Sequence, residues 1–132
     1  MPVRKVTTSS FAREVLESNL PVVVDFYADW CGPCRHVAPV VEHLSQEWDG
    51  KVRFAKVDIE REPRLAEAYR ILSIPAVLLF EGGAPRAWSL GAKPAHALER
   101  ELGLSRRRRE EQGGGFFRRL FRGGPKDKPP QI

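Results

Sequence analysis

Hydrophobic and polar positions along the first hundred residues predict strands and helices in turn. Short apolar or β-branched runs predict strands at residues 3–7, 22–28, 51–59, 76–80 and 84–90. The last two form a hairpin around the turn "EGG". Helices are predicted at residues 11–19, 34–48, 64–72 and 94–102, and Gly103 is the stop signal for the last one. The order βαβαβαββα predicts an α/β fold with a central mixed five-stranded sheet and helices on both faces.

The run "VVVDFYA" at residues 22–28 is apolar and β-branched, which predicts the central strand of the sheet. Asp25 interrupts it, and an ionised carboxylate is costly in such a place unless it has a partner. Asp25 is either a buried carboxyl with a raised pKa, acting as a base directly or through water, or a strand-end residue that faces water. Lys56 either pairs with Asp25 or is a strand-end charge.

Positive charge is concentrated at the C-terminal end of the chain. Residues 1–104 hold 13 Lys and Arg against 14 Asp and Glu, a net charge of −1, and residues 105–132 hold 9 against 3, a net charge of +6. Glycines and prolines also become frequent there. We therefore expect one domain over residues 1–104 and a flexible basic extension over residues 105–132.

The extension contains the segment "FFRRLF" at residues 116–121, which would place aromatic and arginine side chains on opposite faces of a short helix. It is a solubilising extension, a docking peptide for a partner protein, or a motif that binds an anionic membrane surface. We hypothesise docking of one of the last two kinds. Nucleic-acid binding is not expected, because no basic patch interleaved with aromatic residues occurs inside the domain.

The apolar stretches of this sequence are short. The longest are "PVVV" and "PAVLLF", which are too short for a signal peptide or a membrane span. We expect a soluble, cytoplasmic protein, in a compartment that keeps thiols reduced.

Cys31 and Cys34 are the only cysteines, and their spacing fits a redox pair, a zinc site, a haem attachment site or a structural disulfide. A disulfide that closes so short a loop stabilises the fold little. Haem attachment needs a histidine directly after the second cysteine, where Arg35 stands. A zinc site would have to draw its other ligands from His36, His43 and His96, because there is no second cysteine pair. A redox pair is therefore favoured.

The predicted elements place Cys31 just before the N-terminus of a helix. Free N–H groups and the helix dipole stabilise a thiolate at that point. We expect Cys31, in the loop, to be more accessible than Cys34, in the first helical turn. Cys31 would then attack a substrate disulfide, and Cys34 would attack Cys31 to release the reduced substrate.

These residues resemble the thioredoxin family in order and spacing. The matching motifs are "DFYADWCGPC", Pro39 in the following helix, "KVD" at residues 56–58, "SIPAVLLFEGG" at residues 73–83, and Gly91-Ala92. The resemblance covers about residues 3–104 and implies the thioredoxin fold. It also implies the site roles: Cys31 as nucleophile, Cys34 as resolving thiol, Asp25 as buried acid and Lys56 as its neighbour.

The resemblance further implies where a substrate docks. Pro75 matches the family's cis-proline, whose loop packs against the disulfide, and Ile74 before it would offer its backbone to an extended substrate. A flat apolar surface, called the docking patch below, would consist of Trp30, Gly32, Pro33, Ile74, Gly91 and Ala92. Tyr27 is a departure, because the best-known bacterial members have Trp there.

The implied activity is that of a protein-disulfide reductase. It would take electrons from thioredoxin reductase, act as a monomer on disulfide-containing proteins, and need no metal or organic cofactor. The Gly32-Pro33 dipeptide, with no histidine between the cysteines, favours a reductant over the alternative of a dedicated thiol oxidant or isomerase. A further alternative is a non-catalytic binding subunit or a surface-tethered interaction module.

Overall fold

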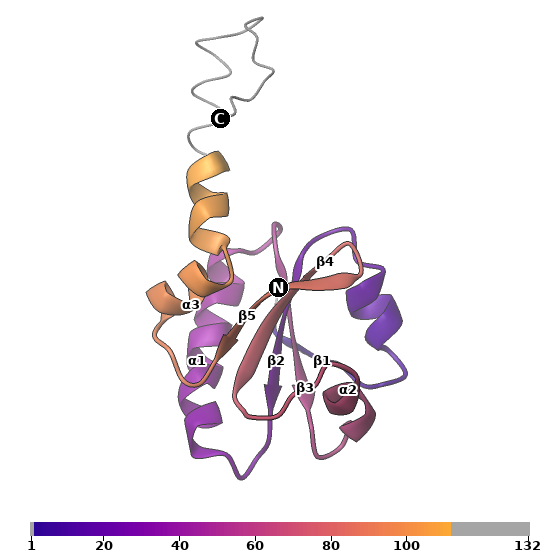
Figure 1. The fold of residues 1–132 in the computed structure, drawn as a ribbon. Coiled ribbons are helices and arrows are strands. Elements are labelled where there is room, and N and C mark those ends of the chain that lie inside the picture. The colour runs from indigo at the N-terminus through magenta and orange to yellow at the C-terminus, as the bar shows by residue number, and fades with distance from the viewer. Residues whose placement is uncertain (1, 112–132) are drawn as a thin grey trace, which may run out of the picture.

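The computed structural model describes residues 2–111 of the chain. The predicted element order is confirmed, and helices cover both faces of a central sheet (Figure 1). The elements are β1 (Arg4–Lys5), the π-helical segment η1 (Ala12–Leu16), β2 (Val22–Tyr27), α1 (Gly32–Glu47), β3 (Arg53–Asp58), α2 (Pro63–Ala68), β4 (Ala76–Glu81), β5 (Ala84–Leu90) and α3 (Ala95–Glu101).

The sheet has five strands in the order β1-β3-β2-β4-β5. Strands β1, β3 and β2 run parallel, whereas β4 is antiparallel to both β2 and β5. The mixed five-stranded sheet is thus confirmed, with β2 at its centre. The position of β2 explains why its sequence is an almost unbroken apolar run, since both of its faces are covered.

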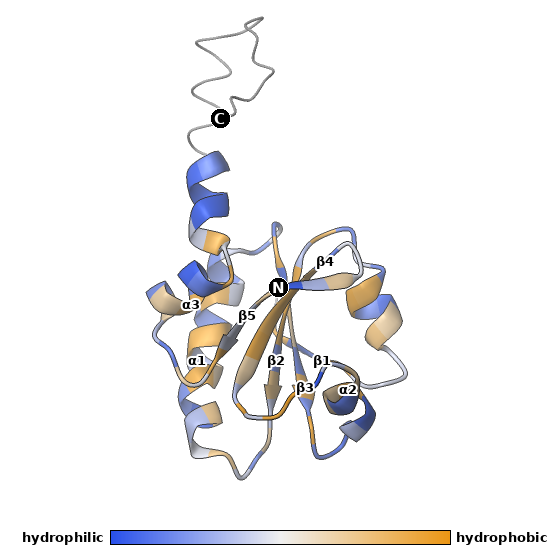
Figure 2. Cartoon of the chain, in the orientation of Figure 1, coloured by the Kyte–Doolittle hydropathy of each residue, from blue (hydrophilic) through white to orange (hydrophobic). Residues whose placement is uncertain are grey.

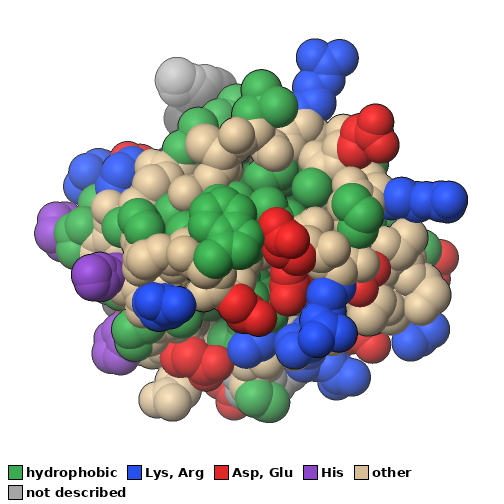
Figure 3. Space-filling model, turned by 90° about the horizontal axis from the view of Figure 1, so that it is seen from below, with side chains coloured by type: hydrophobic (Ala, Val, Ile, Leu, Met, Phe, Trp, Pro, Cys, Tyr) green, Lys and Arg blue, Asp and Glu red, His purple; other side chains and the backbone are tan. Residues whose placement is uncertain are grey.

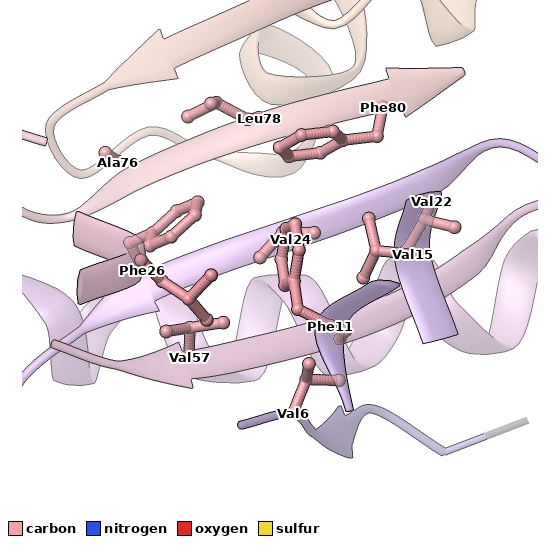
Figure 4. Packing of buried hydrophobic residues seen from close by; sticks show 12 residues of the cluster. Val6, Phe11, Val15, Val22, Val24, Phe26, Val57, Ala76, Leu78 and Phe80 are labelled. Atoms are coloured by element: carbon pink, nitrogen blue, oxygen red, sulfur yellow. The ribbon is translucent and has the colours of Figure 1, made fainter. Parts of the chain in front are cut away.

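Side chains of β2 alternate between two hydrophobic layers. Val22, Val24 and Phe26 point into the layer that η1 and α2 cover, where Phe11 packs against Phe80 with ring centroids 5.5 Å apart (Figure 4). The intervening Val23 points into the opposite layer, beneath α1 and α3, together with Val37, Val41, Leu44 and Leu98. Asp25 follows the same alternation as Val23, so the strand period directs its side chain toward α1.

Helix α2 is shorter than the sequence predicts. We expected a helix over residues 64–72, but it ends at Ala68. Tyr69 packs its ring against Phe11 and Phe80, at centroid distances of 5.5 and 5.1 Å. The next residue, Arg70, has a positive φ of 53°, which cannot continue a right-handed helix.

The chain forms another helix directly after α3. Gly103, with φ of 79°, ends α3 as predicted, and residues 104–111 are helical. Leu104 is fully buried and anchors the start of this helix, whose remaining turns are hydrophilic (Figure 2). The sequence assigns residues 105–111 to the extension, yet they contact the domain. The segment at 116–121 lies outside the described residues, and the division of the chain at residue 104 remains a prediction.

Ion pairs hold the helix of residues 104–111 against the domain. Arg107 pairs with Glu81 at 2.9 Å, and Lys51 pairs with Glu111 at 3.0 Å. Arg108 pairs with Glu99 at 2.6 Å and lies over the ring of Trp48, 4.6 Å from its centroid. The indole N–H of Trp48 donates to the same Glu99 carboxylate at 3.0 Å.

In the part of the chain from residue 2 to residue 111, no helix is both long and apolar enough to cross a membrane.

Candidate active site

The two cysteines lie where β2 leads into α1. Cys31 is the N-cap of α1 with an extended backbone, and Cys34 lies in the first turn. Pro33 occupies an early helical position, where its missing N–H removes no hydrogen bond. The structure pairs Cys31 and Cys34 as a disulfide with their Cα atoms 5.3 Å apart, inside the range that disulfides require.

The sulfur of Cys31 acts as the helix cap. The backbone N–H of Cys34 donates to Sγ of Cys31 over 3.2 Å. A side-chain oxygen usually accepts this bond at the start of a helix. Because the free N–H groups carry partial positive charge, the same geometry stabilises negative charge on the Cys31 sulfur when the disulfide is opened.

The expected difference in accessibility between the cysteines is not present in this disulfide form. Each residue is 3% exposed. The reason is that the Cys31 side chain turns inward to Cys34, and both pack with Ala28 in a small cluster that Tyr27 and Ile74 border. The two thiols are therefore distinguished by the N-cap contact of Cys31 rather than by exposure.

Asp25 is buried in the middle of β2 and is 3% exposed. Burial raises its pKa from 3.8 to about 7, and the positive charge of Lys56 opposes this rise without cancelling it. The parallel pairing of β2 and β3 places Lys56 beside Asp25 in register. Oδ1 of Asp25 has no hydrogen-bond partner among the described residues. The sequence expectation of a buried carboxyl thus agrees with where the strand places it.

A cavity of about 190 Å³ connects Asp25 with the disulfide. Its lining includes Asp25 and Lys56 from the sheet, Cys34 and Ala38 from α1, and Tyr27. This volume is well above what one water molecule needs, and the unpartnered carboxyl oxygen offers such a water an acceptor. The Asp25 carboxyl and Cys34 therefore face one shared cavity.

The predicted docking patch includes exposed residues. On one face of the molecule, hydrophobic side chains gather in the middle and charged ones lie around them (Figure 3). Trp30 is 65% exposed, and Gly32 and Pro33 are exposed at the start of α1. The Ile74–Pro75 peptide bond is cis, and Ile74 packs against the cysteine cluster. The loop that contains the cis-proline therefore packs against the disulfide through Ile74.

Gly91 and Ala92 reach the cis-proline loop from β5. The N–H of Gly91 donates to the carbonyl oxygen of Pro75 over 2.9 Å. Gly91 has φ of 86°, which a residue with a side chain rarely adopts. Both residues are exposed. The structure therefore places Asp25, Lys56 and Cys34 around one cavity and packs Ile74 against the cysteines. The joining of these residues with Trp30 and Ala92 into one docking surface stays a prediction.

Sequence reasoning missed Glu60, which fixes the exposed tryptophan. The indole N–H of Trp30 donates to Oε2 of Glu60 over 3.0 Å. Glu60 follows β3, whose last residue Asp58 accepts the Glu60 backbone N–H at 2.9 Å. Nothing in the local sequence links positions 30 and 60, because only the parallel pairing of β2 and β3 makes them neighbours.

Across residues 2–111, no three His, Cys, Asp or Glu side chains are grouped so that they could hold a metal ion.

Comparison with known proteins shows which family the chain belongs to. The sequence profile described as Thioredoxin matches residues 2–103. The chain belongs to the thioredoxin family. With its cysteine pair it is a thiol-disulfide oxidoreductase, a protein-disulfide reductase of the thioredoxin type.

Relatives named as thioredoxins resemble this chain over most of their length, and one longer relative resembles it over a part. Thioredoxin 1 of Nostoc sp. is 46% identical over 98 residues, which cover 74% of this chain and 92% of that protein. Thioredoxin of Mycobacterium bovis is 48% identical over 98 residues, covering 74% and 84%. The Bifunctional thioredoxin reductase/thioredoxin of Mycobacterium leprae is 46% identical over 98 residues, covering 74% of this chain but 21% of that protein.

Proposed function

We propose that this chain reduces disulfides in other proteins through a mixed disulfide at Cys31. The observation that carries the proposal is the contact between the Cys34 N–H and the Cys31 sulfur at the start of α1. This contact favours Cys31 as the thiolate, which is the attacking form. Gly32 and Pro33 keep the turn between the cysteines exposed, so that a substrate can reach it.

The reaction moves two electrons from the dithiol to the substrate. The Cys31 thiolate attacks one substrate sulfur, the substrate S–S bond breaks, and the other substrate sulfur leaves as a thiolate that takes up a proton. The Cys34 thiol then loses its proton and attacks Cys31. The mixed disulfide breaks, the second substrate thiol leaves, and Cys31 and Cys34 remain as the disulfide.

Asp25 is the base proposed for the second step. It shares a cavity with Cys34, and its pKa of about 7 suits proton transfer near neutral pH. Lys56, beside it in the sheet, keeps this pKa from rising further. Lys56 thus adjusts the basicity of the Asp25 carboxyl.

A reductase recharges the disulfide in this proposal. The Mycobacterium leprae relative, whose printed name joins a thioredoxin reductase to a thioredoxin, supports an electron donor of that class. We propose that the chain acts in the cytoplasm as a monomer and requires no metal or organic cofactor. The Gly32-Pro33 dipeptide favours reduction of substrates over oxidation or isomerisation.

A tethering role for the extension is a second proposal, in which it docks on a partner protein or an anionic membrane surface. The supporting observation is that the helix of residues 104–111 leaves the domain near Trp48, at the end of α1 remote from the cysteines (Figure 1). A helix the length of α1 spans about 24 Å. A docked extension would therefore leave the disulfide free. Truncation after Glu111 should abolish vesicle co-sedimentation or partner pulldown while reductase activity persists.

Insulin reduction, with thioredoxin reductase as electron donor, tests the main proposal. The parent should reduce insulin catalytically, and Cys31→Ser should lose all activity while keeping the parent's melting temperature. A Cys31→Ser protein as active as the parent would contradict catalysis at this site. An inactive parent that still binds disulfide proteins would favour the non-catalytic binding subunit, and a parent that oxidises dithiols faster than it reduces insulin would favour the oxidant.

A further inference from the structure

A single carboxylate holds both ends of the loop that carries Gly91 and Ala92. Oε1 of Glu101 accepts a hydrogen bond from the Ser89 hydroxyl at 2.6 Å. The ammonium of Lys93 donates to both oxygens of the same carboxylate, at 2.9 and 3.0 Å. Three of the four residues from Leu90 to Lys93 have no regular structure, so these side-chain contacts add to the little backbone hydrogen bonding there.

Glu101 is exposed, but the helix that carries it packs on the hydrophobic core. It is the last residue of α3, and its neighbours Leu98 and Leu102 are 1% exposed within the layer beneath α1 and α3. Ser89 is buried on the face of β5 that α3 covers, because it pairs across the sheet with Val77 of that layer. The Glu101 carboxylate thus links the loop to the end of α3.

The fixed loop reaches the cis-proline. Between the two anchor points lies Gly91, whose N–H donates to the Pro75 carbonyl at 2.9 Å. The loop lies at the same end of the sheet as the start of α1 (Figure 1). Glu101 therefore holds the loop by hydrogen bonds to Ser89 and Lys93, and the loop in turn is hydrogen-bonded to Pro75 through Gly91.

We propose that Glu101 is a positioning residue for substrate docking, holding the Gly91–Ala92 edge of the docking patch in place through Ser89 and Lys93. This inference rests on the proposed reductase function. The hydrogen bonds from Ser89 and Lys93 lower the pKa of Glu101, so the carboxylate is charged at neutral pH. Glu101 does not touch the reacting sulfurs. Its effect should therefore appear in the binding of protein substrates and not in the chemistry of the disulfide.

The test compares a protein substrate with a small disulfide. Glu101→Gln and Lys93→Met should raise KM for insulin by roughly three- to fivefold, the size expected for part-exposed ion pairs, with kcat unchanged. The rate with the small disulfide dithiobis(nitrobenzoate) should stay at the parent value, because that molecule needs no docking edge. The double variant should resemble either single variant, because both remove one interaction. Glu42→Gln, at an exposed carboxylate of α1, is the matched control.

Amide hydrogen exchange gives a readout that needs no turnover. The Gly91 amide should exchange faster in Glu101→Gln than in the parent and in Glu42→Gln, at unchanged melting temperature. An unchanged insulin KM with unchanged Gly91 exchange overturns the inference, and so does an equal loss of rate with both substrates. A parent inactive toward both substrates contradicts the proposed function instead, and the Gly91 exchange then decides the positioning role alone.

Discussion

Asp25 and Cys34 line the same cavity, Asp25 from the central strand β2 and Cys34 from the first turn of α1. The strand period turns Asp25 toward α1, and Cys34 is buried in the first turn of that helix. A carboxyl that is costly to bury thus lies where the proposed mechanism needs a base for Cys34. This relationship links the stability of the fold to its chemistry.

Asp25 should make the stability of the protein depend on pH. Its folded pKa of about 7 lies above the ordinary 3.8, so the folded protein holds a proton that the unfolded chain releases between these values. The free energy of unfolding therefore falls as pH rises from about 4 to about 7 and is lowest above that range. Asp25→Asn should raise it by roughly 2 to 4 kcal/mol at pH 8.

Urea denaturation at pH 4 and pH 8 measures this effect. The advantage of Asp25→Asn should shrink toward zero at pH 4, where the buried carboxyl is neutral. Asp29→Asn, at an exposed position two residues after β2, should match the parent at both pH values. An equal gain at both pH values would mean that the charge of Asp25 is not the destabilising feature.

The resolving step should lose its base in the same Asp25→Asn variant. Release of substrate from the mixed disulfide should slow by roughly tenfold or more at pH 7. In the parent the rate should rise with pH through about 7, where Asp25 ionises, and this inflection should be missing in the variant. Stopped-flow measurement of substrate thiol release follows the step directly. A parent-like pH profile in Asp25→Asn would remove Asp25 from the mechanism.

Arg108 should stabilise the fold although the sequence assigns it to the extension. It lies over Trp48 and pairs with Glu99, so Arg108→Gln should lower the free energy of unfolding by about 1 kcal/mol. The difference should diminish in 1 M salt, which screens the ion pair. Arg109→Gln, at the exposed neighbouring position, is the control. Equal melting temperatures for the two variants would show that the Arg108 contacts contribute nothing.

The buried layer under α1 can be tested with two identical substitutions. Leu44→Ala removes a side chain that is 1% exposed and should cost about 2 to 5 kcal/mol in free energy of unfolding. Leu72→Ala removes one that is 94% exposed and should change it by less than about 0.5 kcal/mol. Thermal denaturation compares them. Similar costs at both positions would contradict the assigned burial.

Much of the fold follows from local sequence signals. Three local signals each predict an element from its own residues, and the structure contains all three elements. They are the apolar run of β2, the apolar residues three and four positions apart in α1, and the glycine turn between β4 and β5. The motif "WCGPC" likewise places Cys31 at the start of a helix and Cys34 in its first turn. The end of α2 was predicted less well, because Tyr69 leaves the helix to pack against aromatic rings from distant elements.

Contacts between distant positions could not be predicted in this way. Arg107 and Glu81 are 26 positions apart, and Lys51 and Glu111 are 60 apart. The composition of residues 105–111 therefore suggested a free extension, whereas these ion pairs attach them to the domain. The carboxylate of Glu101 was missed for the same reason, since its role depends on how α3 packs against β5.

Trapping of the mixed disulfide tests the central claim most directly. Cys34→Ser should form a covalent adduct with insulin that dithiothreitol cleaves, and peptide mass analysis should locate it on Cys31. Cys31→Ser should form far less adduct under the same conditions, because its remaining thiol, Cys34, lacks the N-cap contact that favours the thiolate at Cys31. Absence of an adduct in Cys34→Ser, or equally rapid adduct formation at Cys34 in Cys31→Ser, would contradict the account.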